Sequence, residues 1–351
     1  MNKKFLRHQK GITWVHGIII VVVIAIVAAG VWLAIRKPPA PPSKELKVGV
    51  ILPGTVTDYG WDYAPLIALN KLEADIPEVI VGHKFVELVE PAEAEGAIRD
   101  LMAAGYNWIW AWGFQYREAV AAAAVGAPEG TYFTINEGRP ADAVSGKIDV
   151  IDEWPNKTAY LAGIVAASMS KTKKLGSVFG METWHLVAAE VGFEAGAQAY
   201  DPAMTVDRVV VGGWADPEGG RHAAEALMAG GVDVILCQGD GTSLGVIEAV
   251  KSARTAGREV YYVGYPVDQS ILAPGDVLTS LSYDYSGILK DQAQDIQTGN
   301  FGKGNYVIEL GKGMELAPYY NFDEDVPSRA KTVIADARAK IIAGEIVVPY
   351  E

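Results

Sequence analysis

The chain has 351 residues, half of them hydrophobic, which is enough for one large or two medium domains with real cores. Six of its 30 basic residues and none of its acidic residues precede position 38, so the remainder has 24 basic against 43 acidic residues, a net charge of −19. A body this acidic repels phosphate backbones, which argues against nucleic acid as a partner. The single cysteine, Cys237, excludes an intramolecular disulfide.

An apolar run near the N-terminus predicts a membrane helix. The 18 residues from Ile18 to Ile35 carry no charge and would span about 27 Å as a helix, close to the hydrocarbon thickness of a bilayer. The basic residues before the run favour a cytoplasmic N-terminus and a body outside the cell. We therefore expect a single-pass protein of the cell membrane with an extracytoplasmic body.

A cleaved secretory signal is the alternative, but the following RKPPAPPSKE is a poor cleavage site. The stretch KGITWV resembles archaeal prepilin-like signals, in which a cut between Gly11 and Ile12 would leave the apolar helix in place. No cysteine lies near this end for lipid attachment. We predict a basic tip and retained signal anchor over residues 1–37, followed by a proline-rich, extended linker over residues 38–45.

After the linker, short apolar runs alternate with helical patterns. The first half reads as the strands KVGVIL, HKFVELV, NWIWAW and GTYFTIN, separated by helices, and the pattern restarts after Asp149 with KLGSVFG, TVDRVVVG, VDVILCQ and EVYYVGY. This order predicts an α/β fold of two doubly wound parallel-sheet lobes joined by crossovers. Lobe 1 is predicted over residues 46–152 plus about 282–312, and lobe 2 over residues 153–281 plus about 313–351.

Open parallel sheets bind ligands outside the carboxyl ends of their strands, so the residues after each strand are the candidates. The loops there combine turn residues, carboxylates or amides, and aromatic rings. The candidate ligand-binding residues are Asp58, Trp61, Trp112, Phe114, Tyr116, Trp184, Gln238, Asp240, Tyr265, Asp268 and Tyr283. Aromatic faces and carboxylates suit a planar ligand with hydroxyl or N–H groups. The loops contain no ring of arginines, which disfavours a phosphorylated ligand.

Each candidate also has a purely structural interpretation. Asp58 and Asp268 are typical of turns and caps, and Trp61 or Trp184 can pack on a lobe surface. Phe114 and Tyr116 can belong to a core. We expect Trp108 and Trp110 to pack within the sheet and Cys237 to be a small buried strand residue.

Motifs for other functions are missing from the sequence. It has no G-x-G-x-x-G after the first strand, no phosphate-binding G-x-x-x-x-G-K-[ST], and no G-x-S-x-G. The five histidines do not have the spacing of metal ligands. We expect a protein that is not an enzyme and needs no metal or cofactor.

At these loops the sequence resembles the basic membrane protein (BMP, or Med-like) family, extracellular solute-binding proteins similar to type 1 periplasmic binding proteins. The similarity extends over about residues 47–348. Its carriers are GTVTDYGWDYA, GFQYREAV, AYLAGIVAASMSKTKKLGSV, GFEAGAQAYDP, DPEGGRHAAEALMAGGVDVI, QGDG and VGYPVDQS. The resemblance implies the binding component of an ABC importer, a permease as partner, and a purine nucleoside or similar small molecule as ligand.

The resemblance also implies roles for particular residues. Family members contact ligand through an acid and an aromatic residue in the first loop, matched here by Asp58 and Trp61. Further ligand-contact positions of the family are matched here by Phe114, Tyr116, Asp240 and Asp268. A second stacking aromatic falls near Ala189, with Trp184 nearby as a substitute. A lysine expected after the Thr-Ser step is replaced by Ser282, Tyr283 and Asp284.

These departures leave the ligand open. The leading hypothesis is a monomeric solute receptor that closes on a nucleoside-like ligand and presents it to a permease. The alternatives are a receptor feeding a signalling partner, a sugar or other non-nucleoside ligand, and an enzyme acting on nucleosides.

Overall fold

The computed structural model describes residues 44–304 and 306–351. The predicted signal anchor and most of the proline-rich linker lie outside the described residues. The chain divides into two units, and the second, Glu45–Glu351, is called the body below. Within the described part of the chain, no helix is both long and apolar enough to cross a membrane.

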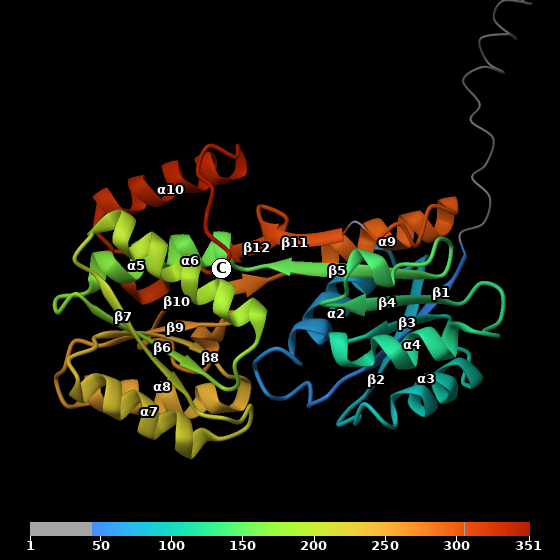
Figure 1. The fold of residues 1–351 in the computed structure, drawn as a ribbon, viewed down its shortest axis with the longest axis horizontal. Helices are drawn as coiled ribbons and strands as arrows, with labels where there is room; N and C mark the ends of the chain where they lie inside the picture. The colour runs from blue at the N-terminus through green and yellow to red at the C-terminus, as the bar shows by residue number, and fades with distance from the viewer. Residues whose placement is uncertain (1–43, 305) are drawn as a thin grey trace, which may run out of the picture. The chain divides into compact units, whose positions relative to one another are not determined.

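The first half of the body is a parallel sheet with helices on both faces (Figure 1). Its strand order is β2-β1-β3-β4-β5. The central strands are buried along most of their length, as expected for apolar runs covered on two sides. The elements are β1 (Leu46–Ile51), α2 (Ala64–Asp75), β2 (Ile80–Val86), α3 (Ala94–Ala103), β3 (Trp108–Ala111), α4 (Arg117–Ala124), β4 (Tyr132–Asn136) and β5 (Ile148–Trp154).

The second half repeats this arrangement. Its strand order, β7-β6-β8-β9-β10, is the same order counted from its own first strand. The elements are α5 (Asn156–Met169), β6 (Lys174–Phe179), α6 (Trp184–Tyr200), β7 (Thr205–Val210), α7 (Pro217–Ala229), β8 (Val234–Gln238), α8 (Asp240–Thr255), β9 (Tyr261–Gly264) and β10 (Val277–Tyr283). The α/β class and the parallel pairing within each half agree with the sequence prediction.

The C-terminal part joins the two halves. After β10 the chain forms α9 (Ser286–Thr298), β11 (Tyr306–Leu310), β12 (Gly313–Leu316) and α10 (Ser328–Ile342). β11 pairs with β5, whereas β12 pairs antiparallel with β10, which makes one continuous, mostly parallel sheet of 12 strands. α9 packs on α2 in the first half, and α10 packs on α5 in the second. We keep the names lobe 1 and lobe 2 for the two halves.

Short 3-10 helices shape the loops between these elements. They are η1 (Phe114–Tyr116), η2 (Pro140–Asp142), η3 (Gln269–Ile271) and η4 (Tyr320–Phe322). The first helix of lobe 1 begins at Ala64, so Trp61 and Asp62 lie in the turn before it. Asp216 caps α7 as its sequence indicates, because its carboxylate accepts from the Gly219 N–H at 2.9 Å.

Candidate functional site

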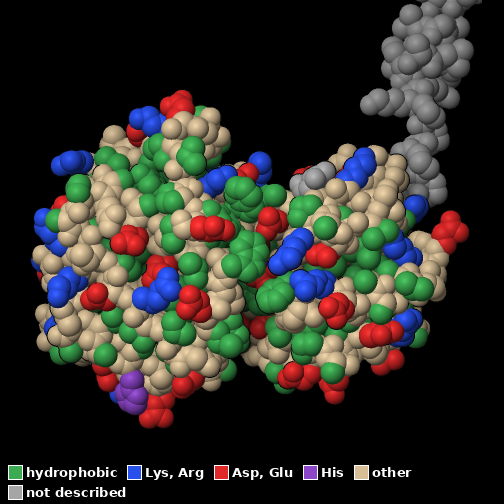
Figure 2. Space-filling view, viewed as in Figure 1, with side chains coloured by type: hydrophobic (Ala, Val, Ile, Leu, Met, Phe, Trp, Pro, Cys, Tyr) green, Lys and Arg blue, Asp and Glu red, His purple; other side chains and the backbone are tan. Residues whose placement is uncertain are grey.

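The loop after β1 lies against lobe 2. The backbone N–H of Trp61 donates to Asp240 Oδ1 at 2.9 Å, and Gln269 Nε2 donates to the Tyr59 carbonyl at 3.0 Å. Gly60 approaches so closely that a Cβ built on it would lie 2.8 Å from the Asp240 Cα. The two lobes therefore touch each other along the boundary visible in Figure 2. We call β5, β11 and β12, which join the lobes, together with the residues next to them, the crossing segments.

Aromatic rings line the lobe 1 side of this boundary. The rings of Trp61 and Trp112 lie 4.6 Å apart, tilted by 35°. Trp112 also meets Trp110 and Tyr285 edge-on, each at 5.0 Å. Trp112 is fully buried at the carboxyl end of β3, while Trp61 is half-buried in the loop. The geometry leaves Trp61 as the ring with remaining surface for a ligand to contact.

On the lobe 2 side, two tyrosines follow β9 and end β10. Tyr283 and Tyr265 are both buried, and their hydroxyl groups are hydrogen-bonded at 2.9 Å. Tyr283 in turn lies 6.1 Å from Tyr285, ring to ring. An unbroken series of aromatic contacts thus runs from Trp61 in lobe 1 to Tyr265 in lobe 2.

Two polar side chains at the carboxyl ends of β3 and β8 are buried without a hydrogen-bond partner among the described residues. They are the indole N–H of Trp112 and both amide atoms of Gln238, which is 1% exposed at the end of β8. An unsatisfied buried donor or acceptor costs about 1–3 kcal/mol. These atoms are suited to bind the polar groups of a ligand. We call Asp58, Trp61, Asp62, Trp112, Gln238 and Asp240 the interlobe site.

Three carboxyl groups of the interlobe site repel one another. Burial, and then the charges of Asp240 and Asp58, raise the pKa of Asp62 to about 9. Burial and Asp58 raise the pKa of Asp240 to about 7, although part of the Asp240 residue remains exposed. Burial also raises the pKa of Asp58, against hydrogen bonds from the Gly60 and Asp62 N–H groups that favour its charged form. Asp62 and Asp240 are therefore able to hold a proton near neutral pH.

A second buried polar cluster lies where β5 leaves lobe 1. Glu153 accepts from Asn136 Nδ2 at 2.7 Å and from the Tyr285 hydroxyl. Burial, followed by repulsion from Glu137, raises the pKa of Glu153 to about 7. Its other oxygen, Oε2, has no hydrogen-bond partner in the described part of the chain.

His185, at the start of α6, supplies a positive charge to this cluster. Its Nδ1 lies 3.0 Å from Glu137 Oε1, an ion-pair distance without hydrogen-bond alignment. Burial alone would lower the pKa of His185, but Glu137 and Asp152 outweigh burial and raise it to about 9. The histidine is thus mainly protonated at neutral pH and bridges lobe 2 to the loop after β4.

The remaining predicted residues lie in different surroundings. Tyr116 is buried in the core of lobe 1, where its hydroxyl donates to the Val89 carbonyl at 2.6 Å, so packing accounts for its position. Phe114, beside it on η1, is 42% exposed. Asp268 caps η3 through the Ser270 N–H and accepts from the Tyr320 hydroxyl at 2.5 Å. Trp184 is 47% exposed and stands beside His185 and Tyr350.

Trp108 and Trp110 are fully buried in the sheet, and Cys237 is a buried strand residue, in agreement with the sequence. Sequence reasoning missed Asp62, Asn136 and Gln269 as parts of these polar clusters, whereas it weighed His185, with Trp184, between the wall of a ligand site and packing within the lobe. Asp62 was detectable, because it stands next to Trp61 in a loop already singled out. Gln269 and Asn136 gave no signal, since single amides after strands are common.

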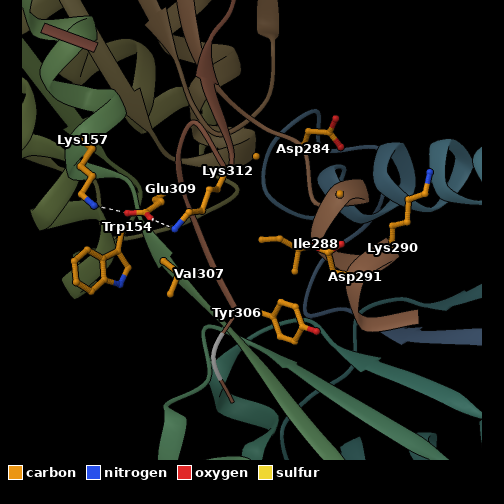
Figure 3. Close-up of a pocket in the computed structure, with 12 residues that line it drawn as sticks. Trp154, Lys157, Asp284, Ile288, Lys290, Asp291, Tyr306, Val307, Glu309 and Lys312 are labelled. Carbon is orange, nitrogen blue, oxygen red and sulfur yellow. Dashed lines mark hydrogen bonds and ion pairs between the residues drawn. The ribbon is translucent and has the colours of Figure 1, made fainter. Parts of the chain in front are cut away.

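A cavity of about 680 Å³ lies elsewhere, on the crossing segments (Figure 3). Lys157 and Lys312 both point toward Glu309, and Lys312 lies 2.7 Å from it. Trp154 and Tyr306 form part of its walls. None of the residues of the interlobe site lines this cavity. Within the described ranges, no group of three or more His, Cys, Asp or Glu residues is placed to hold a metal ion.

Comparison with known proteins places this architecture among solute receptors. The family model described as "ABC transporter substrate-binding protein PnrA-like" matches residues 45–351. Basic membrane protein A2 of Borrelia garinii subsp. bavariensis is 28% identical over 304 residues, covering 87% of this chain and 88% of the relative. The ABC transporter nucleoside-binding protein BmpA of Lactococcus lactis subsp. cremoris is 28% identical over 261 residues, covering 70% of this chain and 72% of the relative. A solute-binding protein of an ABC transporter system from Aeropyrum pernix has the same fold, with a TM-score of 0.75 and 19% identity over 87% of this chain and 94% of its own.

Proposed function

We propose, since the chain belongs to the PnrA-like family of ABC transporter substrate-binding proteins, that it binds a nucleoside-like ligand between its two lobes. A small-molecule ligand and a permease partner follow from the family; the nucleoside-like nature of the ligand is the proposal. The name of the Lactococcus lactis relative, a nucleoside-binding protein, supports it. So does a purine-binding protein of Brucella abortus that is 27% identical over 304 residues, covering 86% of this chain and 83% of that protein.

One observation carries this proposal. The buried and unpartnered Trp112 indole N–H and Gln238 amide lie at the carboxyl ends of β3 and β8, on the two lobes. Trp61 offers a ring in contact with Trp112, and Asp240, two residues after Gln238, offers a carboxylate. A nucleobase has a flat face for the indole and edge groups that donate and accept hydrogen bonds. Closure of the lobes on such a ligand satisfies atoms that the chain itself leaves without partners.

The proposal extends to placement and partners. The apolar run over residues 18–35 anchors the protein, with its body on the extracytoplasmic side of the cell membrane. The body acts as a monomer that delivers its ligand to ABC permease subunits. Antibody labelling of intact against permeabilised cells tests the placement, and labelling only after permeabilisation would contradict it.

Thermal unfolding of the purified chain tests ligand binding. A nucleoside present at 100 times its dissociation constant should add about 2.7 kcal/mol to the free energy of unfolding. Inosine, adenosine, guanosine and free ribose are the probes. A shift with ribose but with no nucleoside would contradict the nucleoside-like ligand.

The substitution Trp61→Ala tests the site within the same assay. It removes the ring that contacts Trp112. We therefore expect the apparent affinity for the nucleoside, measured from the thermal shift, to fall at least tenfold. Tyr200→Ala, at the far end of α6, is the matched aromatic control and should retain the full shift. Equal shifts in both variants would remove Trp61 from the site.

A further inference from the structure

The carboxylates of the interlobe site have no cationic partner in the described part of the chain. Asp58 accepts from the backbone N–H groups of Gly60 and Asp62, and Asp240 accepts from that of Trp61. None of Asp58, Asp62 and Asp240 forms an ion pair with a lysine, arginine or histidine among the described residues. Several acids elsewhere in the body form ion pairs, as in Lys157–Glu309, Arg208–Glu190 and Lys71–Asp284.

Aromatic faces lie beside this excess of negative charge. The Trp61 ring stacks on Trp112, and the Trp61 backbone N–H bonds directly to Asp240. The face of an indole attracts positive charge, at about 0.5–2 kcal/mol for each contact. A carboxylate cluster edged by tryptophan therefore offers two independent attractions to the same cation.

Buried polar atoms without a hydrogen-bond partner occur in the same segments as these carboxylates. Asp62 is 6% exposed, and its Oδ1 has no hydrogen-bond partner among the described residues. The amide of Gln238, two residues before Asp240, and the indole N–H of Trp112 are likewise buried and unpartnered. Each of these three groups lies in a segment that carries a residue of the interlobe site, in the loop after β1 or at the carboxyl ends of β3 and β8. They indicate a bound molecule there independently of the charges.

We infer that the ligand of the interlobe site is a planar heterocycle with a fixed positive charge, such as the N-alkylpyridinium ring of a cationic nucleoside. This inference rests on the proposed function and narrows its ligand class. A neutral base supplies no counter-charge to these acids, so Asp62 stays protonated at neutral pH and any charge left on Asp58 and Asp240 is unpaired in a closed site, which is unfavourable. A cationic ring supplies that charge and stacks on Trp61 at the same time.

Protonation should be linked to the binding of a cation. The charged groups that face the cluster are Asp58 and Asp62 in the loop after β1, Glu87 after β2, Glu137 after β4, Asp240 on α8, and His185 beside Glu137 on α6. All but the histidine are acids, and the pKa values of Asp62 and Asp240 stand at about 9 and 7. A bound cation lowers both pKa values, so binding at pH 7 releases protons and strengthens as the pH rises.

The test compares two ligands that differ by one charge. Nicotinamide riboside carries a pyridinium cation, and its reduced form, dihydronicotinamide riboside, has nearly the same shape without the charge. Titration calorimetry of the full chain at pH 7 and pH 8 gives both affinities. We expect the cation to bind at least tenfold more tightly, more so at pH 8, with proton release seen as a dependence of the heat on buffer. Equal affinities, a preference for the neutral form, or proton uptake overturns the inference.

Variants separate charge from folding. Asp62→Asn keeps the shape of the side chain, and we expect it to reduce the preference for the cation to less than threefold. Asp100→Asn, an exposed acid on α3, is the matched control and should keep the full preference. Thermal melts of both variants establish that each is folded. An unchanged preference in Asp62→Asn overturns the role of the cluster.

The outcomes also distinguish this inference from the proposed function. If inosine or adenosine binds and nicotinamide riboside does not, the nucleoside site stands and the cationic ligand is wrong. If no nucleoside of either charge binds, the proposed function fails and the inference falls with it.

Discussion

Asp62 shows how the interlobe site affects stability at the scale of one residue. The side chain is buried between Gly54 and two other acids, with no cation to offset its charge in the described chain. Its pKa of about 9 means that the folded body holds the proton to high pH, whereas the unfolded chain loses it near the ordinary value of 3.8. The carboxyl group therefore destabilises the folded body increasingly as the pH rises from about 4 to about 9.

Replacing Asp62 by asparagine removes this penalty. We expect Asp62→Asn to raise the free energy of unfolding by at least about 1.4 kcal/mol at pH 8, the value of one pKa unit, and by much less at pH 5. Denaturant unfolding at the two pH values measures the difference. Asp100→Asn should have no effect at either. A gain of the same size at both pH values contradicts the burial argument.

Single residues also mark the limit of what the sequence could predict. Trp61, Trp112 and Asp240 were identified because aromatic and acidic residues after strands are unusual enough to notice. Tyr116 is also an aromatic residue in the loop after a strand, yet its hydroxyl donates to the Val89 carbonyl inside lobe 1. Whether such a side chain points toward the core or toward the other lobe decides its role. A short loop has no periodic pattern of apolar residues from which this direction can be predicted.

At the scale of elements, the loop after β1 can reach α8 only because residue 60 has no side chain. The backbone of Gly60 has no positive φ angle, so alanine is conformationally allowed there. Its Cβ would nevertheless lie 2.8 Å from the Asp240 Cα, closer than such atoms approach. The glycine is therefore required by the contact between lobes.

We expect Gly60→Ala to weaken ligand binding at least tenfold. The added methyl group holds the loop away from α8 and opposes closure. Gly275→Ala, at a loop glycine with open space around it, is the control and should bind normally. Normal affinity in Gly60→Ala would show that binding does not need this contact.

Helices α5 and α6 pack through glycines in lobe 2. A Cβ on Gly196 would lie 1.9 Å from the Tyr160 carbonyl oxygen, and Gly163 and Gly192 are equally close to the opposing backbone. Such a contact leaves no room for even one methyl group. This packing fixes the position of α6, whose first turn carries His185.

We expect Gly196→Ala to destabilise lobe 2 by about 1–3 kcal/mol, the usual effect of overpacking. Gly287→Ala is the matched control, because it lies in helix α9 with nothing within 4 Å. Alanine should stabilise that helix by up to about 1 kcal/mol. Chemical denaturation compares the two, and effects of the same sign would contradict the packing argument.

The elements themselves were largely predictable. The apolar run KVGVIL forms β1, and the Asp216–Pro217 step forms the capped start of α7. The C-terminal part of the chain was predictable only in outline, because its strands β11 and β12 are only five and four residues long. The antiparallel pairing of β12 with β10 depends on where the crossing segments bring the chain, which no local pattern specifies.

At the scale of the whole molecule, the two lobes share one strand order, and the sequence indicated this through its restart after Asp149. The sequence did not indicate how closely the lobes approach. That approach combines Gly60, the Trp61–Asp240 hydrogen bond and the Gln269–Tyr59 hydrogen bond, which come from segments about 180–210 residues apart. Contacts of this range are a property of the folded body.

A crystal structure of the body with a bound nucleoside tests the central claim most directly. The account predicts the ligand between the lobes, with its ring against Trp61 and its polar groups bonded to Gln238 and Asp240. A ligand seated instead in the cavity of the crossing segments, against Trp154 and Lys157, would contradict it.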